Sequence, residues 1–97
     1  MVNIIFNEIK IKFKKLIEEL ELLTPDNDID EYKSYVKEKL ARLNQIENIS
    51  TRRDALLIDS IIRSTSRFID NFKINSNEVN IILDDLNKDS ISILEKI

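Results

Sequence analysis

The chain has no glycine and only one proline, Pro25, so almost nothing in its 97 residues can interrupt a helix. Cysteine, histidine and tryptophan are absent as well. Without cysteine or histidine, no thiolate or imidazole can serve as nucleophile, base or soft-metal ligand, and without glycine no ordinary phosphate-binding loop can form. We therefore expect no catalytic residue, no metal, no cofactor and no enzymatic activity.

Composition narrows the class of protein further. Hydrophobic residues make up 42% and charged residues 34% of the chain, a balance unlike that of disordered proteins. The net charge of -3 argues against nucleic-acid binding, which needs clustered positive charge. No apolar run has the length of a membrane span, and the first residues do not resemble a secretory signal. We expect one cytoplasmic domain over residues 1–97, in contact with a membrane surface at most.

Apolar residues recur at steps of three and four in four successive segments, which is the spacing of amphipathic helices. The pattern predicts helices over residues 3–23, 29–47, 51–72 and 76–96. The predicted inward residues are Val2, Ile5, Phe6, Ile9, Phe13, Leu16, Ile17, Leu20, Leu23, Ile29, Tyr32, Val36, Leu40, Leu43, Ile58, Ile61, Ile62, Thr65, Phe68, Ile69, Phe72, Val79, Ile82, Leu83, Leu86, Ser90, Ile93, Leu94 and Ile97.

Capping signals precede the last three predicted helices. They are the pairs Asp28 with Glu31, Thr51 (or Ser50) with Asp54, and Asn75 with Glu78. The connections between the helices are short, which favours antiparallel neighbours. We predict an all-α, antiparallel, up-down four-helix bundle, monomeric rather than dimeric. The competing interpretation is a helical hairpin that completes its core only by dimerising.

Residues that the core does not need indicate where a partner binds. The Leu56–Arg67 line, which consists of Leu56, Ser60, Arg63 and Arg67, is predicted to face outward, and arginine beside an apolar residue suits interfaces. Our hypothetical partner-binding surface is this line with Lys73 and Asn77. Other apolar residues predicted to face outward are Ile4, Ile11, Leu22 and Ile81. The competing interpretation is that single exposed apolar residues are normal, or that the helix phase is inexact.

Charge is unevenly distributed between the predicted third and fourth helices. Residues 50–75 carry five basic and three acidic side chains, and residues 76–97 carry two basic and five acidic ones. Either these helices neutralise one another at the surface, or the polarity orients a partner. The lysines within residues 10–15 are interpreted as a solvated face rather than a membrane-binding patch. The acidic cluster at residues 26–31 lacks the glycine of a calcium-binding loop.

The layout of the chain resembles one known family. The likeness lies in its size, the helical stretch Tyr35–Leu43, the long third helix, and the tight connection Phe72–Val79 leading into Ile82–Leu86. Over residues 5–95 the chain is similar to the immunity proteins of pediocin-like bacteriocins, the enterocin A immunity group. The resemblance implies a cytosolic antiparallel four-helix bundle whose C-terminal half discriminates among bacteriocins.

The resemblance also implies a function. Members of that family protect a bacteriocin-producing cell from its own peptide by binding the receptor–bacteriocin complex at the inner side of the mannose phosphotransferase permease. We expect the same non-enzymatic role here. The alternative is a small phage, plasmid or viral helical adaptor or inhibitor that acts through protein–protein contacts, in dimeric form through Ile4, Ile11 and Leu22.

Overall fold

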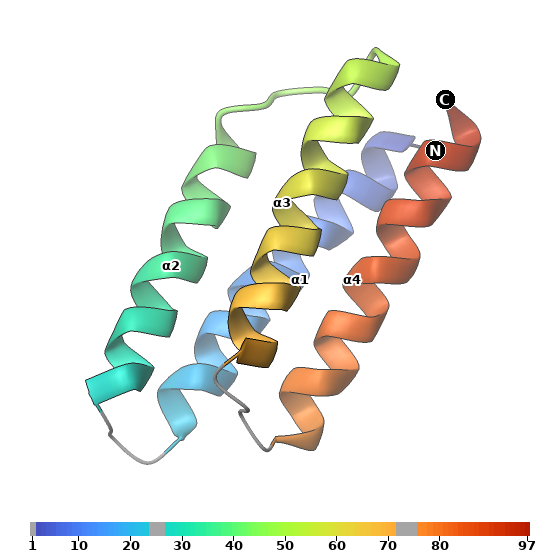
Figure 1. Ribbon diagram of the computed structural model, residues 1–97. Helices are drawn as coiled ribbons and strands as arrows, with labels where there is room; N and C mark the ends of the chain where they lie inside the picture. Colours follow the sequence, from blue (N-terminus) through green and yellow to red (C-terminus); the bar gives the residue numbers. More distant parts are fainter. Residues whose placement is uncertain (1, 24–26, 72–75) are drawn as a thin grey trace.

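The chain folds into four packed helices in the computed structural model, which describes residues 2–23, 27–71 and 76–97, the side chains of residues 27–29 excepted. The helices are α1 (Val2–Leu22), α2 (Asn27–Asn44), α3 (Arg52–Asn71) and α4 (Asn77–Lys96) (Figure 1). The predicted all-α four-helix bundle is confirmed. Three helices agree with their predicted bounds to within one residue, whereas α2 begins two residues and ends three residues before its prediction.

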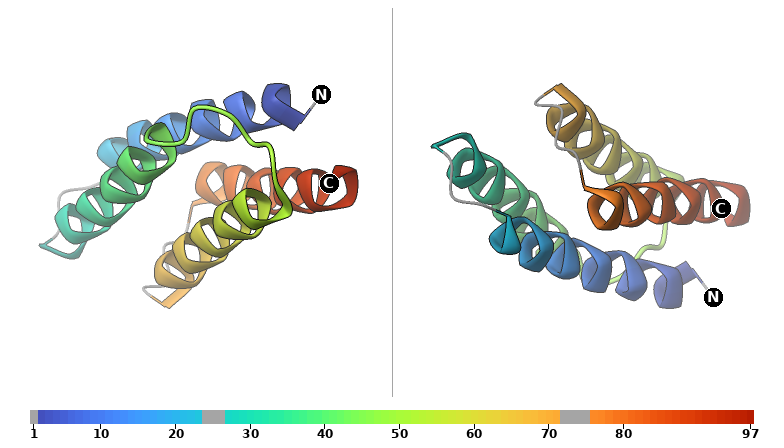
Figure 2. Two further views of the ribbon diagram at one scale, coloured as in Figure 1. Left: turned by 90° about the horizontal axis from the view of Figure 1, so that it is seen from above. Right: turned by 90° about the horizontal axis from the view of Figure 1, so that it is seen from below.

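The helices pack as a ring in which each contacts its two neighbours. The helix α1 packs against α2 and α4, and α3 packs against the same two helices from the other side. Both end-on views place α1 diagonally opposite α3 (Figure 2). Consecutive helices run in opposite directions, so the two ends of the chain lie at the same end of the bundle (Figure 1).

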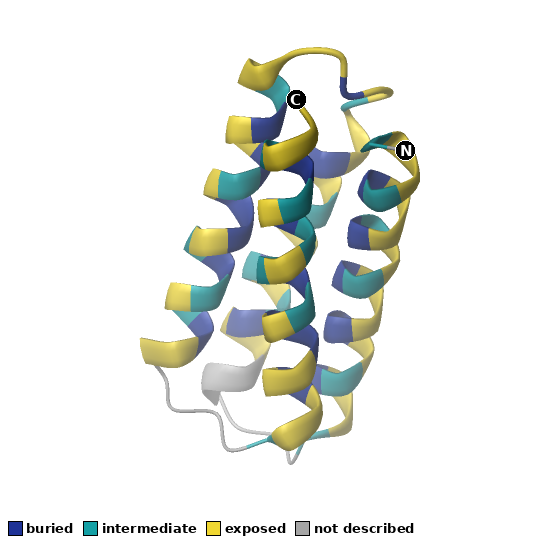
Figure 3. Cartoon of the chain, turned by 90° about the vertical axis from the view of Figure 1, so that its right-hand side faces the viewer, coloured by how far each residue is buried: buried dark blue, intermediate teal, exposed yellow. Residues whose placement is uncertain are grey.

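The core contains the predicted stripes and, on α3, also Ala55, which was not predicted. Burial alternates with exposure around each helix (Figure 3). On α1 the residues Phe6, Ile9, Phe13, Leu16, Ile17 and Leu20 are buried. Val2, Ile5, Leu23, Leu40, Phe68 and Leu94 pack against the core but are only partly buried. One prediction is wrong: Ile97 is 40% exposed, because it is the C-cap of α4 and lies outside the helical turns that hold the stripe against the core. The predicted core side chains of Ile29 and Phe72 lie outside the described ones.

The connection between α2 and α3 adds core residues that the helical spacing did not predict. Ile49 is buried although it lies between helices, and Ile46 is partly buried. Both are fixed to α1, since the Ile49 amide donates a hydrogen bond to Asn3 Oδ1 (2.8 Å) and Lys10 Nζ donates one to the Ile46 carbonyl (3.2 Å). These bonds satisfy backbone groups that would otherwise be lost from the helical ladder.

Two of the three predicted caps differ in the structure. The capping box of α3 is confirmed: the Asp54 amide donates to Thr51 Oγ1 (3.2 Å), and the Thr51 amide donates to Asp54 Oδ2 (3.3 Å). For α4 the N-cap is Ser76, whose extended backbone precedes the helix and whose hydroxyl accepts from the Val79 amide. The predicted cap Asn75 lies outside the described residues. Asp28 is not a cap, because α2 begins at Asn27 and Asp28 lies within its first turn.

An aromatic cluster joins α2 to α3. The ring of Tyr35 stacks on Phe68, with centroids 3.9 Å apart and planes 2° from parallel, and Tyr32 meets Phe68 edge to face at 5.8 Å. Lys39 Nζ lies 4.8 Å from the centroid of the Tyr35 ring. Large rings reach across the contact between these two helices, where smaller side chains would leave a void.

Candidate functional site

The Leu56–Arg67 line lies on the solvent side of α3. Leu56 is 49% exposed, and Ser60, Arg63 and Arg67 are exposed as well, as their spacing predicts. The line extends over about 16 Å of helix at 1.5 Å per residue. Asn77, the sixth residue of the hypothetical surface, is exposed at the start of α4, whereas Lys73, the fifth, lies outside the described residues.

A hydrogen-bonded pair that the sequence analysis did not identify supports this line from below. Ser90 on α4, which is buried, donates a hydrogen bond from Oγ to Asp59 Oδ1 on α3 at 2.6 Å. The other carboxylate oxygen, Oδ2, lies 2.9 Å from Nε of Arg63. Asp59 therefore links the two helices and holds the guanidinium group of Arg63 through Nε, while the Arg63 side chain is still 62% exposed. The signal in the sequence was the four-residue step from Asp59 to Arg63.

The register of α3 against α4 sets which residues of the two helices lie at one level of the bundle. Asp59 is bonded to Ser90, and Arg52 Nη1 donates a hydrogen bond to the Leu94 carbonyl at 3.4 Å. Leu56 lies between Arg52 and Asp59 on α3, so it is level with the segment of α4 between Ser90 and Leu94. That segment contains Ile91, which is 51% exposed.

The excess of positive charge on α3 is not neutralised by direct ion pairs with α4. In residues 2–23, 27–71 and 76–97, no ion pair joins these two helices, although α4 is the acidic helix of the bundle. The ion pairs between helices are Lys12 with Asp89 (2.5 Å) and Lys37 with Glu21 (3.6 Å), and both involve α1. Of the two arginines in the Leu56–Arg67 line, Arg63 is paired within α3 to Asp59, and Arg67 has no partner among the described residues.

The N-terminal turn of α3 contains an acidic residue, Asp54, whose pKa is shifted. Asp54 Oδ2 accepts hydrogen bonds from the backbone amides of Ser50 (3.1 Å) and Thr51 (3.3 Å). These donors, the Ser50 amide first, lower the pKa of the Asp54 carboxyl below its ordinary value of 3.8. The shift follows from the capping geometry, so it indicates helix stabilisation rather than catalysis.

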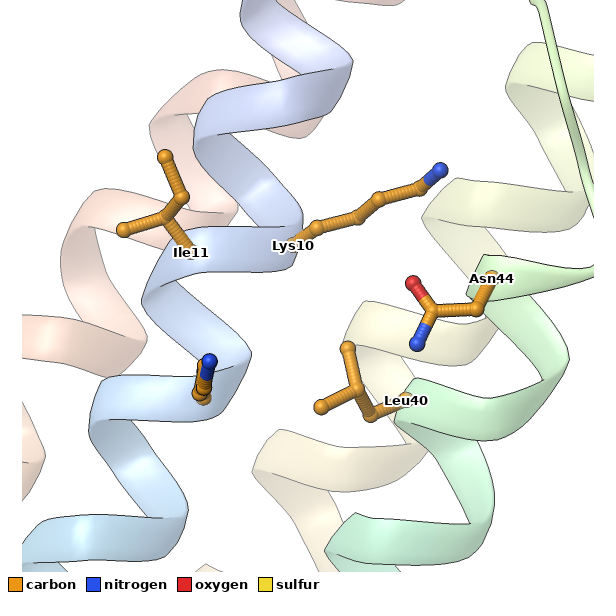
Figure 4. A pocket seen from close by; sticks show the side chains of 5 residues that line it. Lys10, Ile11, Leu40 and Asn44 are labelled. Atoms are coloured by element: carbon orange, nitrogen blue, oxygen red, sulfur yellow. The ribbon is translucent and has the colours of Figure 1, made fainter.

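The described residues offer few other features that would indicate chemistry. Those residues contain no group of three or more Asp or Glu side chains placed to hold a metal ion, and no helix long and apolar enough to cross a membrane. Thr65 is buried and donates to the Ile61 carbonyl of its own helix at 2.8 Å. A shallow groove of about 260 Å³ runs between α1 and α2, lined by Lys10, Ile11, Lys14, Leu40 and Asn44 (Figure 4).

Comparison with known proteins gave no relative. No protein-family model matches the chain, and neither a curated protein nor a solved structure matches it.

Proposed function

We propose that the chain is a bacteriocin immunity protein, a non-enzymatic protein that binds the complex of a bacteriocin and its mannose-permease receptor from the cytosolic side. The observation that carries this proposal is the exposed Leu56–Arg67 line on α3. The line lies in the C-terminal half of the chain, where the family resemblance implies that bacteriocins are discriminated. The four-helix architecture is also the one that the resemblance implies.

The chemistry of the line fits a protein partner that presents acidic groups. Arginine forms charge-assisted hydrogen bonds with carboxylates and tolerates partial burial, so it is frequent at the energetic centre of interfaces. Arg63 is already held at its base by Asp59, which reduces the side-chain entropy that binding would cost. Leu56 supplies apolar area beside the two arginines, and the exposed Ile91 of α4 lies at the same level of the bundle.

The decisive experiment is a protection assay. The chain is expressed in a bacteriocin-sensitive strain, and a panel of pediocin-like peptides is titrated. We expect a selective increase in the inhibitory concentration for one or a few peptides. Arg63→Glu combined with Arg67→Glu should abolish that increase, because each central arginine of an interface typically contributes about 2 kcal/mol, or more than tenfold in affinity.

A matched control separates charge at this site from charge in general. Lys37→Glu combined with Arg42→Glu makes the same change in net charge on α2, where both side chains are exposed. The only described contact this control removes is the half-exposed Lys37–Glu21 pair, which is worth little. The control should protect like the unmodified chain, with both variants helical by circular dichroism. Full protection by the Arg63 and Arg67 variant would refute the assigned surface, and no protection against any peptide would refute the function.

A second candidate function is favoured by a different observation. Ile4, Ile11 and Leu22 on α1 are 61%, 66% and 78% exposed, and α1 lies diagonally opposite α3. Such a face suits a small helical adaptor or inhibitor of phage, plasmid or viral type, which acts through protein–protein contacts. If the soluble, helical chain protects against no peptide, affinity capture with Ile11→Lys as the control variant tests this candidate.

A further inference from the structure

The outer side of α1 carries a regular line of exposed residues that the bundle does not use. The Ile11–Leu22 line consists of Ile11, Lys15, Glu18 and Leu22, which follow one another at steps of four, three and four residues. All four are exposed, Ile11 to 66% and Leu22 to 78%. Ile11 lies at the α1 edge of the groove that it lines with Leu40 and Asn44 of α2 (Figure 4).

The two flanks of α1 are already occupied, which leaves this line at the middle of its free face. On one flank Lys12 pairs with Asp89 of α4. On the other flank Lys10 donates to the Ile46 carbonyl, and Glu21 pairs with Lys37 of α2. Within the described chain, Lys15 and Glu18 have no hydrogen-bond or ion-pair partner.

Charge along α1 is segregated by sign. All its lysines lie within residues 10–15, and three of its four glutamates lie within residues 18–21. When two copies of such a helix run antiparallel, the basic segment of each lies beside the acidic segment of the other. When they run parallel, like charges oppose one another and the pairing is unfavourable.

We propose that the Ile11–Leu22 line binds a second copy of this chain, with the two α1 helices antiparallel about a two-fold axis between Leu16 and Ile17. In this register Ile11 packs against Leu22 of the second copy, and Lys15 pairs with Glu18 of the second copy. Each contact occurs twice, as two-fold symmetry requires. The interface is therefore self-complementary in both its apolar and its charged positions.

Other registers lose this complementarity. If Ile4 faced Leu22 of the second copy, Glu8 would face Glu18, and Ile11 would face Lys15. The antiparallel register with Ile11 opposite Leu22 avoids a repulsive contact along the line and pairs both of its exposed apolar residues. Charge therefore determines both the direction and the register of the pair.

The predicted dimer is weak and reversible. One helix pair buries less than the roughly 1,200 Å² of stable interfaces, so we expect a dissociation constant of about 10–100 µM. At lower concentrations the chain is a monomer, as the sequence analysis expects. Since α3 is diagonally opposite α1, the dimer leaves the Leu56–Arg67 line free on both copies, and the inference does not depend on the proposed function.

Sedimentation equilibrium over a concentration series tests the proposal directly. The unmodified chain should increase in average mass from monomer toward dimer within that range. Lys15→Glu and Glu18→Lys should each weaken self-association at least tenfold, because like charges then face one another at both central positions. Mixed in equal amounts, the two variants should associate, since every contact between them again joins opposite charges. A single chain carrying both exchanges should dimerise like the unmodified chain.

Control variants and contrary outcomes are well defined. Arg42→Glu, a charge reversal on the exposed side of α2, and Arg63→Glu combined with Arg67→Glu should dimerise unchanged. A chain that stays monomeric at millimolar concentration would overturn the proposal. So would a dimer that survives both single charge reversals, or two variants that fail to associate when mixed while both remain helical.

Discussion

Truncation of Phe68 to alanine tests how α2 and α3 are held together. A fully covered phenylalanine side chain buries about 150–250 Å². Truncation to alanine removes about 120 Å² of this buried apolar area, which corresponds to about 3 kcal/mol of transfer free energy at about 25 cal/mol per Å². Phe68 is only partly buried, which reduces this contribution to about 2 kcal/mol. Its stacking on Tyr35 adds about 1 kcal/mol. We therefore expect Phe68→Ala to lower the free energy of unfolding by about 3 kcal/mol.

The matched comparison is Phe13→Ala, because Phe13 has no exposed surface. Phe13→Ala should lower the free energy of unfolding by more, about 3–5 kcal/mol, because the cost of the buried cavity adds to the lost transfer free energy. Both losses are large compared with the free energy of unfolding of a typical domain, which is about 5–15 kcal/mol. Urea unfolding followed by circular dichroism at 222 nm measures them, and Tyr35→Ala completes a double-mutant cycle that should show about 1 kcal/mol of coupling to Phe68.

Two outcomes would contradict the reasoning. A loss below about 1 kcal/mol for Phe68→Ala would mean that the ring is not part of the joint between α2 and α3. A loss larger than that of Phe13→Ala would mean that the centre of the core lies nearer to α3 than the burial of these two residues indicates. An unchanged slope of unfolding against urea in all variants is required for either conclusion.

Two further perturbations test the polar groups of α3. The pKa of Asp54 is lowered in the folded chain, so its charged form contributes stability above pH 3.8, and that contribution is lost as the pH falls through the folded pKa. Asp54→Asn should therefore destabilise the chain at pH 7 and make little difference near pH 2, which urea unfolding at several pH values would show. Ser66 Oγ is buried with no hydrogen-bond partner in the described structure. Ser66→Ala should therefore leave the free energy of unfolding unchanged or raise it by about 1 kcal/mol. A clear decrease in melting temperature would contradict the absence of a hydrogen bond to this hydroxyl.

The fold was predictable because each helix repeats one signal many times. Six buried residues on α1 all agree with the same 3.6-residue period, so an error at one position cannot change the assignment. The cap of α3 was predictable for a related reason, since Thr51 and Asp54 form a reciprocal pair that is visible in the sequence. For α4 the choice between Asn75 and Ser76 depended on where the chain leaves its extended conformation, and both residue types cap well.

Contacts between elements were not predictable in the same way. Ile49 lies outside every periodic stripe. It is buried in the connection between α2 and α3, where its backbone amide is hydrogen-bonded to Asn3 on α1. Asp59 reads as an ordinary charge on a helix surface until Ser90 of α4 is placed 2.6 Å from it. The position of Ile91 relative to Leu56 was unpredictable for the same reason, since only the register of α3 against α4 puts the two at one level of the bundle.

The two exposed lines differ in what they can bind, and the difference lies in their charges. Along α1, Lys15 and Glu18 lie between Ile11 and Leu22, so an antiparallel copy places an opposite charge beside each of the two charged residues. The Leu56–Arg67 line contains two arginines and no acidic residue, so a second copy laid on it in either direction leaves those arginines without acidic partners on the opposing line. Self-association through α3 is therefore less favourable than through α1, and the acidic partner proposed for the Leu56–Arg67 line has to be a different molecule. A chain with Lys15→Glu should accordingly remain monomeric while retaining whatever binding α3 provides.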